Sequence, residues 1–282
     1  MEEKTKTTIE QVERYWSKQS EMYLNTDERG FGAVIYSGMP IWFNSFFNHY
    51  QQKAFMTLTE GINFSGLSAL DVGSGVGRWS HILYKKGCKV IGIDFEKSRL
   101  QKAKKNPNLK NITFKNMSVV NLEFEDNIFD FTNSITVLQH IPHENKSTAI
   151  KEVCRATKKG GYILIIELID LFDDAPHVFP LSDKGWIDIF ANNGCELIKK
   201  VGCEFSPLLR ILRYIRYVLT KKKNIDKSTG RITLSKFELL IMRVVILLSY
   251  PIEEVCVSIT PAKYARHGGY LFKKLSKRKK EF

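Results

Sequence analysis

The 282-residue sequence lacks the features that would indicate a secreted, membrane-spanning or zinc-binding protein. Its five cysteines are scattered and odd in number, and no C-x-x-C pair occurs, so neither a disulfide framework nor a zinc site is indicated. Residues 1–6 show no apolar core of a signal peptide. The nearly apolar run 237–250 is too short to cross a bilayer. We therefore expect reduced thiols, no metal and a cytoplasmic location.

The positive charge of the chain is confined to its C-terminal part. Residues 1–204 contain 25 lysines plus arginines and 25 aspartates plus glutamates, so their formal charges cancel. Residues 205–282 contain the other 18 basic and 5 acidic residues, and 18 − 5 gives the whole net charge of +13. This distribution argues against a generally basic, nucleic-acid-binding enzyme and predicts a local electropositive surface.

A glycine-rich stretch lies between an apolar run and a helical pattern. Residues 67–72 are mostly apolar, and Trp79, Ile82 and Leu83 recur at helical spacing. Between them stand Gly73, Ser74, Gly75, Val76 and Gly77. Alternate glycines let the backbone turn tightly and leave room for a ligand where side chains would collide. The stretch predicts a strand, a glycine turn and a helix whose first N–H groups are free.

Two acidic residues place negative charge near this turn. Asp71 precedes Gly73 by two positions, and Asp94 ends the next apolar run, 21 positions after Gly73. A carboxylate at about that distance, at the end of the second strand of a β-α-β unit, is placed to accept hydrogen bonds from ribose hydroxyls. Asp71 would repel a pyrophosphate but suits a cationic group. The pattern therefore predicts a nucleoside with a positively charged tail, and it disfavours a nicotinamide cofactor.

These segments resemble motifs of the class I S-adenosylmethionine-dependent methyltransferases. D-V-G-S-G-V-G is similar to their first motif and V-I-G-I-D to their second, and residues 127–131, 137–141 and 159–164 continue the match in the family's order. The resemblance covers roughly residues 11–205 and resumes near His267. It implies S-adenosyl-L-methionine as the cofactor and S-adenosyl-L-homocysteine as the product. The motif pattern is closest to small-molecule and sugar O-methyltransferases.

Alternating apolar runs and helical patterns predict an α/β, Rossmann-like fold with a seven-stranded, mostly parallel sheet covered by helices on both faces. We expect strands near 67–72, 88–94, 111–115, 128–134, 161–167 and 195–203, and helices near 77–86, 96–104, 145–157 and 183–193. The resemblance implies a final antiparallel strand from His267. We divide the chain into an N-terminal helical lid segment (1–60), the cofactor-binding core (61–205), a helical insertion (206–266), and the last strand with a basic tail (267–282).

Ligands on a parallel sheet lie beyond the carboxyl ends of its strands, which selects the predicted cofactor residues. They are Tyr15, Tyr23, Asp71, Gly73, Ser74, Gly75, Gly77, Asp94, Phe95, Met117, Ser118 and Asn133. The resemblance implies the two tyrosines, because a leading aromatic helix covers the cofactor in many members; packing of a helical layer is the alternative. Met117 suits packing on adenine and Ser118 a hydrogen bond to its amino group, although both also suit a simple turn.

Methyl transfer from a sulfonium requires close, aligned reactants and, for a hydroxyl acceptor, a base. His140, after the fourth strand, is the first candidate because histidine titrates near working pH. Some small-molecule O-methyltransferases of this class pair a histidine there with an acid after the fifth strand, which the resemblance places at Glu167. His177 in the following loop is the rival, and a structural role stays open for each histidine. The pair Asp173–Asp174 lacks the further ligands of a metal site.

Three functions stay open from the sequence. The first is methyl transfer to a small-molecule or glycan acceptor, at a hydroxyl oxygen in our main hypothesis, although nitrogen and carbon acceptors are not separated from oxygen. The second is methyl transfer to RNA or protein through the basic C-terminal region; no D/N-P-P-Y segment is present, which disfavours methylation of base amines. The third is a non-catalytic nucleoside-binding partner protein.

The insertion 206–266 combines apolar runs with basic residues. We expect buried helices that form a substrate lid or a homodimer contact. Peripheral contact with anionic lipid at the inner membrane surface is the alternative.

Overall fold

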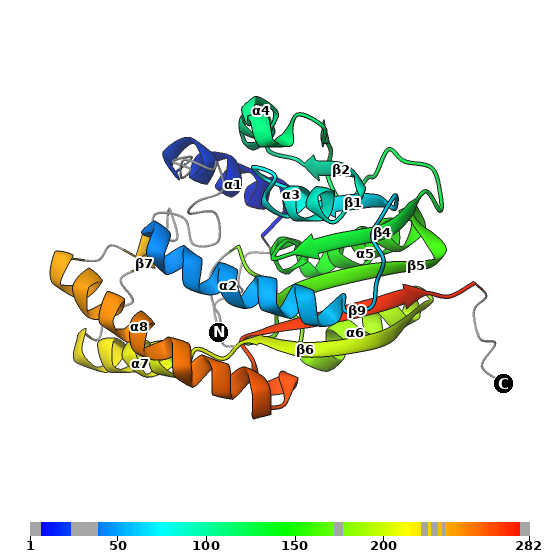
Figure 1. Cartoon of the computed structure of the whole chain (residues 1–282). Helices are drawn as coiled ribbons and strands as arrows, with labels where there is room; N and C mark the ends of the chain where they lie inside the picture. The colour runs from blue at the N-terminus through cyan, green and yellow to red at the C-terminus, as the bar shows by residue number, and fades with distance from the viewer. Residues whose placement is uncertain are drawn as a thin grey trace.

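The computed structural model describes residues 7–23, 39–171, 177–220, 225–226, 231–232 and 235–276. A seven-stranded sheet lies at its centre in the order β3-β2-β1-β4-β5-β9-β6 (Figure 1). Its strands are β1 (Ser68–Val72), β2 (Lys89–Asp94), β3 (Thr113–Asn116), β4 (Phe129–Ile135), β5 (Thr157–Leu168), β6 (Cys195–Glu204) and β9 (His267–Lys274). Neighbouring strands from β3 to β5 pair in parallel, and β9 is antiparallel to both β5 and β6. The predicted seven-stranded, Rossmann-like α/β fold is confirmed.

Helices cover both faces of this sheet. They are α1 (Ile9–Tyr23), α2 (Ile41–Leu58), α3 (Arg78–Lys85), α4 (Lys97–Lys105), α5 (His143–Ala156), α6 (Asp183–Asn192), α7 (Pro207–Thr220) and α8 (Lys236–Ile259). Short 3-10 helices are η1 (Pro107–Leu109), η2 (Leu138–His140) and η3 (Ala262–Tyr264), and β7 (Ile225–Asp226) pairs with β8 (Arg231–Ile232). The predicted helical insertion before the last strand is therefore present as α7 and α8.

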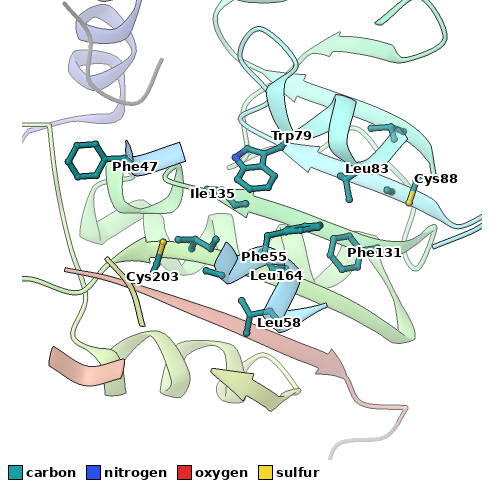
Figure 2. Close-up of a cluster of buried hydrophobic side chains, with 14 of the residues drawn as sticks. Phe47, Phe55, Leu58, Trp79, Leu83, Cys88, Phe131, Ile135, Leu164 and Cys203 are labelled. Atoms are coloured by element: carbon teal, nitrogen blue, oxygen red, sulfur yellow. The ribbon is translucent and has the colours of Figure 1, made fainter. Parts of the chain in front are cut away.

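Successive residues of the central strands point to opposite helical layers, as the pleat of a strand requires. In β5, Leu164 and Ile166 belong to the hydrophobic cluster that α2 and α3 cover, whereas Ile163 and Ile165 belong to the cluster under α5 and α6. All four side chains are fully buried. Figure 2 shows Phe55 of α2 in the first cluster, above the sheet near Leu164. The two-sided core makes the sheet rigid enough to position residues at its rim.

The order of the strands reverses between β1 and β4, which are neighbours in the sheet although β2 and β3 separate them in sequence. Asp71 of β1 is in register with Asn133 of β4, and Asn133 Nδ2 donates to Asp71 Oδ1 at 3.0 Å. In open α/β sheets, ligands bind in the crevice beyond the carboxyl ends of the strands at such a reversal. The fold therefore places the candidate site beside Asp71 and Asn133.

The insertion differs from its predicted burial. The apolar run 237–250 is part of α8, which begins with a capping box at Ser235 and continues to Ile259. Along this helix only Ile246, Ser249 and Glu253 are buried. The outer side of α8 is therefore exposed in the single chain, where the sequence analysis expected buried helices of a lid or a homodimer contact. Its apolar residues surround the helix, a pattern typical of a buried helix, but α8 packs on one side only, against α2, α7 and β6.

Candidate active site

The glycine turn joins β1 to α3. Gly73, Gly75 and Gly77 all have a positive φ, of 66°, 55° and 87° respectively, which glycine adopts without steric cost. A Cβ on Gly77 would lie 2.5 Å from Leu109 Cδ1, so a larger residue would collide with the core. The nearest atom to a Cβ on Gly75 would be Asp94 Oδ2, at 4.0 Å. The backbone at Gly75 is therefore open to the close approach of a ligand.

Asp94 at the end of β2 lies directly against this turn. Its Oδ2 accepts a hydrogen bond from the Gly75 N–H at 2.9 Å, and its Oδ1 accepts one from the Glu96 N–H at 2.8 Å. Burial raises the pKa of Asp94, although Arg99 and the two N–H groups oppose that shift. A carboxylate oxygen can accept more than one hydrogen bond, so the positioned Asp94 carboxylate can also accept hydrogen bonds from hydroxyl groups of a ligand.

Asp71 is 1% exposed, and both of its oxygens are bonded within the protein. Ser80 Oγ donates to Oδ2 at 2.6 Å, and Asn133 Nδ2 donates to Oδ1. Burial raises the pKa of Asp71 to about 6, against the effect of these two hydrogen bonds and of Arg78. The structure thus brings Asp71 and Asn133 together and holds the Asn133 amide in one orientation.

Two buried oxygen atoms near the strand reversal have no hydrogen-bond partner among the described residues. They are Ser74 Oγ in the glycine turn and Asn133 Oδ1 on β4. Buried polar atoms are generally hydrogen-bonded in native proteins, so these two atoms are suited to polar groups of a ligand. Together with the open backbone at Gly75 and the carboxylate of Asp94, they fit the amino and hydroxyl groups of an adenosyl amino acid.

The segments that follow β2 and β3 are tied to each other beside Asp94. The Met117 N–H donates to the Asp94 carbonyl oxygen at 3.0 Å. Asn116 Nδ2 donates to the carbonyl oxygens of Asp94 at 3.0 Å and of Phe95 at 2.7 Å. Met117 is buried and Ser118 is half-buried. The structure therefore brings the predicted residues Phe95, Met117 and Ser118 to the same side of the crevice as Asp94.

Helix α1 lies on the N-terminal end of α4. Ser17 Oγ donates to the Glu96 carboxylate, and Arg99 Nε donates to Ser20 Oγ at 2.6 Å. The Arg99 guanidinium also lies 5.0 Å from the centroid of the Trp16 ring. The sequence analysis missed Arg99 and Glu96, because their partners are almost eighty residues away in the chain. The side chain of Tyr23, predicted to contact the cofactor, lies outside the described part of the structure. Asp173 and Asp174 also lie outside it.

Aromatic residues of α1 contact both candidate histidines. The Tyr15 ring stacks on His177 with centroids 4.0 Å apart, and the Trp16 ring meets His140 edge-on at 4.8 Å. The rings of His140 and His177 lie 5.5 Å apart. We call Tyr15, Trp16, His140 and His177 the histidine cluster. The structure thus brings both rival histidines together and places Tyr15 against one of them.

The protonation of His140 follows from its partners. Its Nδ1 lies 2.8 Å from the His177 carbonyl oxygen, and because a carbonyl only accepts, Nδ1 carries the proton and Nε2 keeps its lone pair. Gln139 Nε2 lies 3.4 Å from His140 Nε2 and donates to that lone pair. Burial lowers the pKa of His140 to about 3, with a smaller contribution from the neighbouring His177. Burial also lowers the pKa of His177 to about 4. Both imidazoles are therefore neutral at pH 7.

The two histidines predict how acid affects stability. Their pKa values in the folded protein lie below the value of about 6.5 for unfolded histidine, so the unfolded chain binds more protons between those limits. The stability that neutral histidines contribute is complete above about pH 6.5 and is lost as the pH falls toward 4. We expect the urea-unfolding free energy of the variant His140→Gln/His177→Gln to decrease less on acidification than that of the wild type. The control His49→Gln changes an exposed histidine and should follow the pH profile of the wild type. If the double variant follows that profile as well, His140 and His177 are not buried in the neutral form.

Glu167, at the end of β5, is fully buried and holds the turn that carries His140. Its carboxylate accepts hydrogen bonds from the backbone N–H groups of residues 137–139 at 3.0–3.2 Å and from Ser134 Oγ at 3.4 Å. Burial raises the pKa of Glu167 to about 7, although the three N–H groups oppose the shift. Its contacts place Glu167 beneath the turn, bonded to backbone groups of the protein.

Lys146 of α5 is a buried residue that the sequence analysis missed. Its Nζ donates to the carbonyl oxygens of Leu138 at 2.7 Å and Phe179 at 2.6 Å, and lies 5.0 Å from the centroid of the Trp186 ring. Burial lowers its pKa to about 7, and the nearby Glu167 carboxylate opposes the shift. Lys146 thereby joins η2 to the loop after His177. Nothing in the sequence signals this burial, because a single lysine in an amphipathic helix normally faces solvent.

Among the described residues, no group of three or more histidine, cysteine or acidic side chains is arranged to bind a metal ion.

Comparison with known proteins places this site in a class. The strand order and the glycine turn at the strand reversal are those of a Rossmann-like domain. Residues 63–183 match the family model described as a methyltransferase domain. The match covers less than half of the chain, and within that part it confirms the resemblance to methyltransferases inferred from the motifs.

Sequence relatives share part of the chain. A demethylmenaquinone methyltransferase of Staphylococcus aureus (strain MRSA252) is 34% identical over 106 residues, which are 36% of this chain and 43% of the relative. The enzyme of the same name from Staphylococcus saprophyticus is 36% identical over 107 residues, 36% of this chain and 45% of the relative. The chain therefore matches less than half the length of these curated relatives.

Solved structures show the same fold at low sequence identity. The [4+2]-cyclase SpnF has a TM-score of 0.61 at 15% identity, covering 95% of this chain and 96% of SpnF. An S-adenosylmethionine-dependent methyltransferase from Mesorhizobium loti has a TM-score of 0.54 at 13% identity, covering 80% of this chain and 98% of that protein. At these identities the similarity establishes the fold alone.

Proposed function

We propose that this protein is an S-adenosylmethionine-dependent methyltransferase that methylates a hydroxyl group of a small-molecule acceptor. The observation that carries the proposal is the open glycine turn at Gly75, with the Asp94 carboxylate positioned against it, inside a methyltransferase domain. The sequence relatives named demethylmenaquinone methyltransferases have a small molecule in their name, which supports this acceptor class over RNA or protein. A glycan acceptor stays within the proposal.

The residues of this chain divide the work of binding the cofactor. Asp94 would accept hydrogen bonds from the ribose hydroxyls, because its carboxylate is oriented by two backbone N–H groups. Ser74 Oγ and Asn133 Oδ1 would form hydrogen bonds with polar groups of the same ligand. Asp71 would act through Asn133, whose amide it holds, since Asp71 is only 1% exposed and is hydrogen-bonded to Ser80 and Asn133. When bound, S-adenosylmethionine supplies a methyl group activated by its sulfonium.

His140 would take the proton of the acceptor hydroxyl at Nε2. That atom carries the lone pair because Nδ1 donates to the His177 carbonyl oxygen, which also fixes the ring. The acceptor oxygen would lose its proton to His140 as it takes the methyl group that the sulfonium supplies, and the neutral thioether would leave as the product. Burial disfavours a charged imidazole, but the positive charge of the sulfonium disappears in the same step, so the total charge of the site is unchanged. Glu167 and Lys146 position the turn beneath His140.

The proposal is tested first by binding and then by turnover. Titration calorimetry of the purified chain with S-adenosylmethionine and S-adenosylhomocysteine should show saturable binding of both. A panel of phenolic, sugar and other hydroxyl-bearing small molecules, assayed by methyl transfer from a labelled cofactor, should then identify an acceptor. Absence of binding to either compound would refute the cofactor assignment. Binding with transfer only to RNA or protein would refute the acceptor class.

Alanine at His140 should lower kcat about 10²–10⁴-fold for an acceptor found in that panel, because the hydroxyl proton then has no positioned base. The affinity for S-adenosylmethionine, measured by calorimetry, should stay within about twofold, because the proposed contacts of the cofactor lie elsewhere. His143→Ala is the matched control, since His143 is exposed at the start of α5. Unchanged turnover of the His140 variant would remove the base assignment and leave the cofactor assignment intact.

A further inference from the structure

We propose that the outer face of α8 docks on the surface of an anionic lipid bilayer. The outer face of α8 consists of Phe237, Leu240, Ile241, Val244, Leu247, Leu248, Ile252, Val255 and Ile259, whose exposed fractions run from 37% to 75%. Steps of three and four residues place them along one side of the helix. Single exposed apolar residues are common, but a continuous stripe along a 24-residue helix marks an interaction surface.

Contacts of the opposite side hold α8 in this orientation. The buried Glu253 carboxylate accepts hydrogen bonds from the N–H groups of Phe205 at 2.5 Å and Ser206 at 2.7 Å. Tyr50 of α2 donates from its hydroxyl to the Tyr250 carbonyl oxygen at 3.1 Å. Rotating α8 to bury its apolar side would break these bonds and leave the Glu253 carboxylate without them. The exposed stripe is therefore built into the fold.

The charge of this region selects the occupant. Residues 205–266 hold 12 basic and 4 acidic residues, and Lys236, Arg243 and Lys263 are exposed on α8 and the adjoining η3. Two copies of the chain docked through α8 would bring two insertions of formal charge 12 − 4 = +8 together, which like-charge repulsion opposes. An anionic bilayer offers both the apolar layer that the stripe requires and the opposite charge. We therefore assign the face to a bilayer and not to a second copy.

The helix would lie along the bilayer surface. Within the described ranges no helix has the length and apolar character needed to cross a membrane. The apolar stripe with cations beside it is the pattern of a helix that lies in the interface, with its apolar side among the upper acyl chains. Tyr264 of η3, 58% exposed next to Lys263, has the amphipathic character that suits the same depth.

The insertion that carries α8 leaves the sheet at the rim that also carries the candidate site. It starts at the end of β6, where His267 Nδ1 lies 3.0 Å from Glu204 Oε2 and His267 is in register with Leu168 at the end of β5. Arg210 of α7 donates to Asp170, just after β5, at 3.4 Å. Figure 1 shows α7 and α8 side by side, with α2 next to α8.

Vesicle co-sedimentation of the full chain, without cofactor or acceptor, tests the proposal. We expect binding to vesicles of phosphatidylcholine mixed with phosphatidylglycerol, and much weaker binding to phosphatidylcholine alone. The variant Leu240→Gln/Leu247→Gln should bind the mixed vesicles at least about tenfold more weakly than the wild type, because two exposed apolar side chains are lost. Lys236→Glu/Arg243→Glu should weaken binding to the mixed vesicles and reduce its dependence on salt. Met56→Gln/Ile198→Gln, which changes exposed apolar residues elsewhere, should bind like the wild type.

Several results would overturn the assignment. Absence of wild-type binding to the mixed vesicles, or equal binding by the Leu240→Gln/Leu247→Gln variant, would do so directly. A dimer of the wild type in sedimentation velocity that this variant abolishes would assign the face to a second copy instead. Circular dichroism and cofactor calorimetry of each variant show whether the fold is retained. Because the vesicle measurement uses no cofactor, its failure leaves the proposed methyl transfer untouched.

Discussion

Replacing Asp94 with alanine should weaken the binding of S-adenosylmethionine about 100-fold or more. Hydrogen bonds to a charged group contribute about 1.5–3 kcal/mol each, and two of them from ribose hydroxyls account for at least a 100-fold change in Kd. The substitution also removes the acceptor of the Gly75 and Glu96 N–H groups, which loosens the turn against which the ligand lies. Titration calorimetry with S-adenosylmethionine and its demethylated product measures the effect.

Two further variants interpret that result. Asp94→Asn keeps one carbonyl acceptor, so its affinity should lie between those of the wild type and the alanine variant. Asp188→Ala removes an exposed aspartate that pairs only with Lys184 four residues away, and it should change nothing, since exposed ion pairs contribute little. If Asp94→Ala binds the cofactor as tightly as the wild type, Asp94 does not contact the nucleoside and the site must be sought elsewhere.

Lys146→Met should lower the free energy of unfolding by about 3 kcal/mol or more. Methionine fills a similar volume against Trp186, but it removes the Lys146 donor from the carbonyl oxygens of Leu138 and Phe179 and leaves Glu167 without the nearby positive charge. Among the described residues, the Leu138 carbonyl oxygen keeps only the Ile141 N–H as a donor. Removing one partner of a buried charged group typically costs about 3–5 kcal/mol. Urea denaturation at neutral pH measures the change.

The control for this prediction lies on the same helix. Lys151 of α5 is exposed, so Lys151→Met should stay within about 0.5 kcal/mol of the wild type. Combining Lys146→Met with Glu167→Gln should destabilise the protein by less than the sum of the two single effects, because each substitution removes the charge that the other leaves unbalanced. If Lys146→Met lowers the free energy of unfolding no more than Lys151→Met does, the contacts of Lys146 do not stabilise the folded state.

The elements of the sheet could be predicted because they depend on local patterns. Strands 68–72 and 89–94 differ from their predicted bounds by one residue, and α5 begins at His143, two residues before the predicted helix 145–157. The position of Asp94 beside the glycine turn also followed from spacing alone, because a β-α-β unit brings the ends of its two parallel strands to one rim. Family motifs then identified the class of domain.

Contacts between residues far apart in sequence could not be predicted in the same way. The sequence placed Asp71 at a ligand, yet the fold gives both its oxygens to Ser80 and Asn133. His140 and His177 were rivals for one role, and the fold joins them through a hydrogen bond that assigns the proton of His140. In each case the partner is chosen by packing of the chain, which residue type and spacing do not encode.

Apolar periodicity, the glycine turn and the acid at Asp94 were sufficient to specify a Rossmann-like, cofactor-binding sheet, because strand and helix formation depends on neighbours a few residues apart. Tertiary packing alone could bury Lys146 under η2 and leave one side of α8 exposed. Both follow from which surfaces the completed sheet and its helices cover. A side chain has the same local pattern whether it is covered or not, so its burial and its partner are properties of the assembled chain.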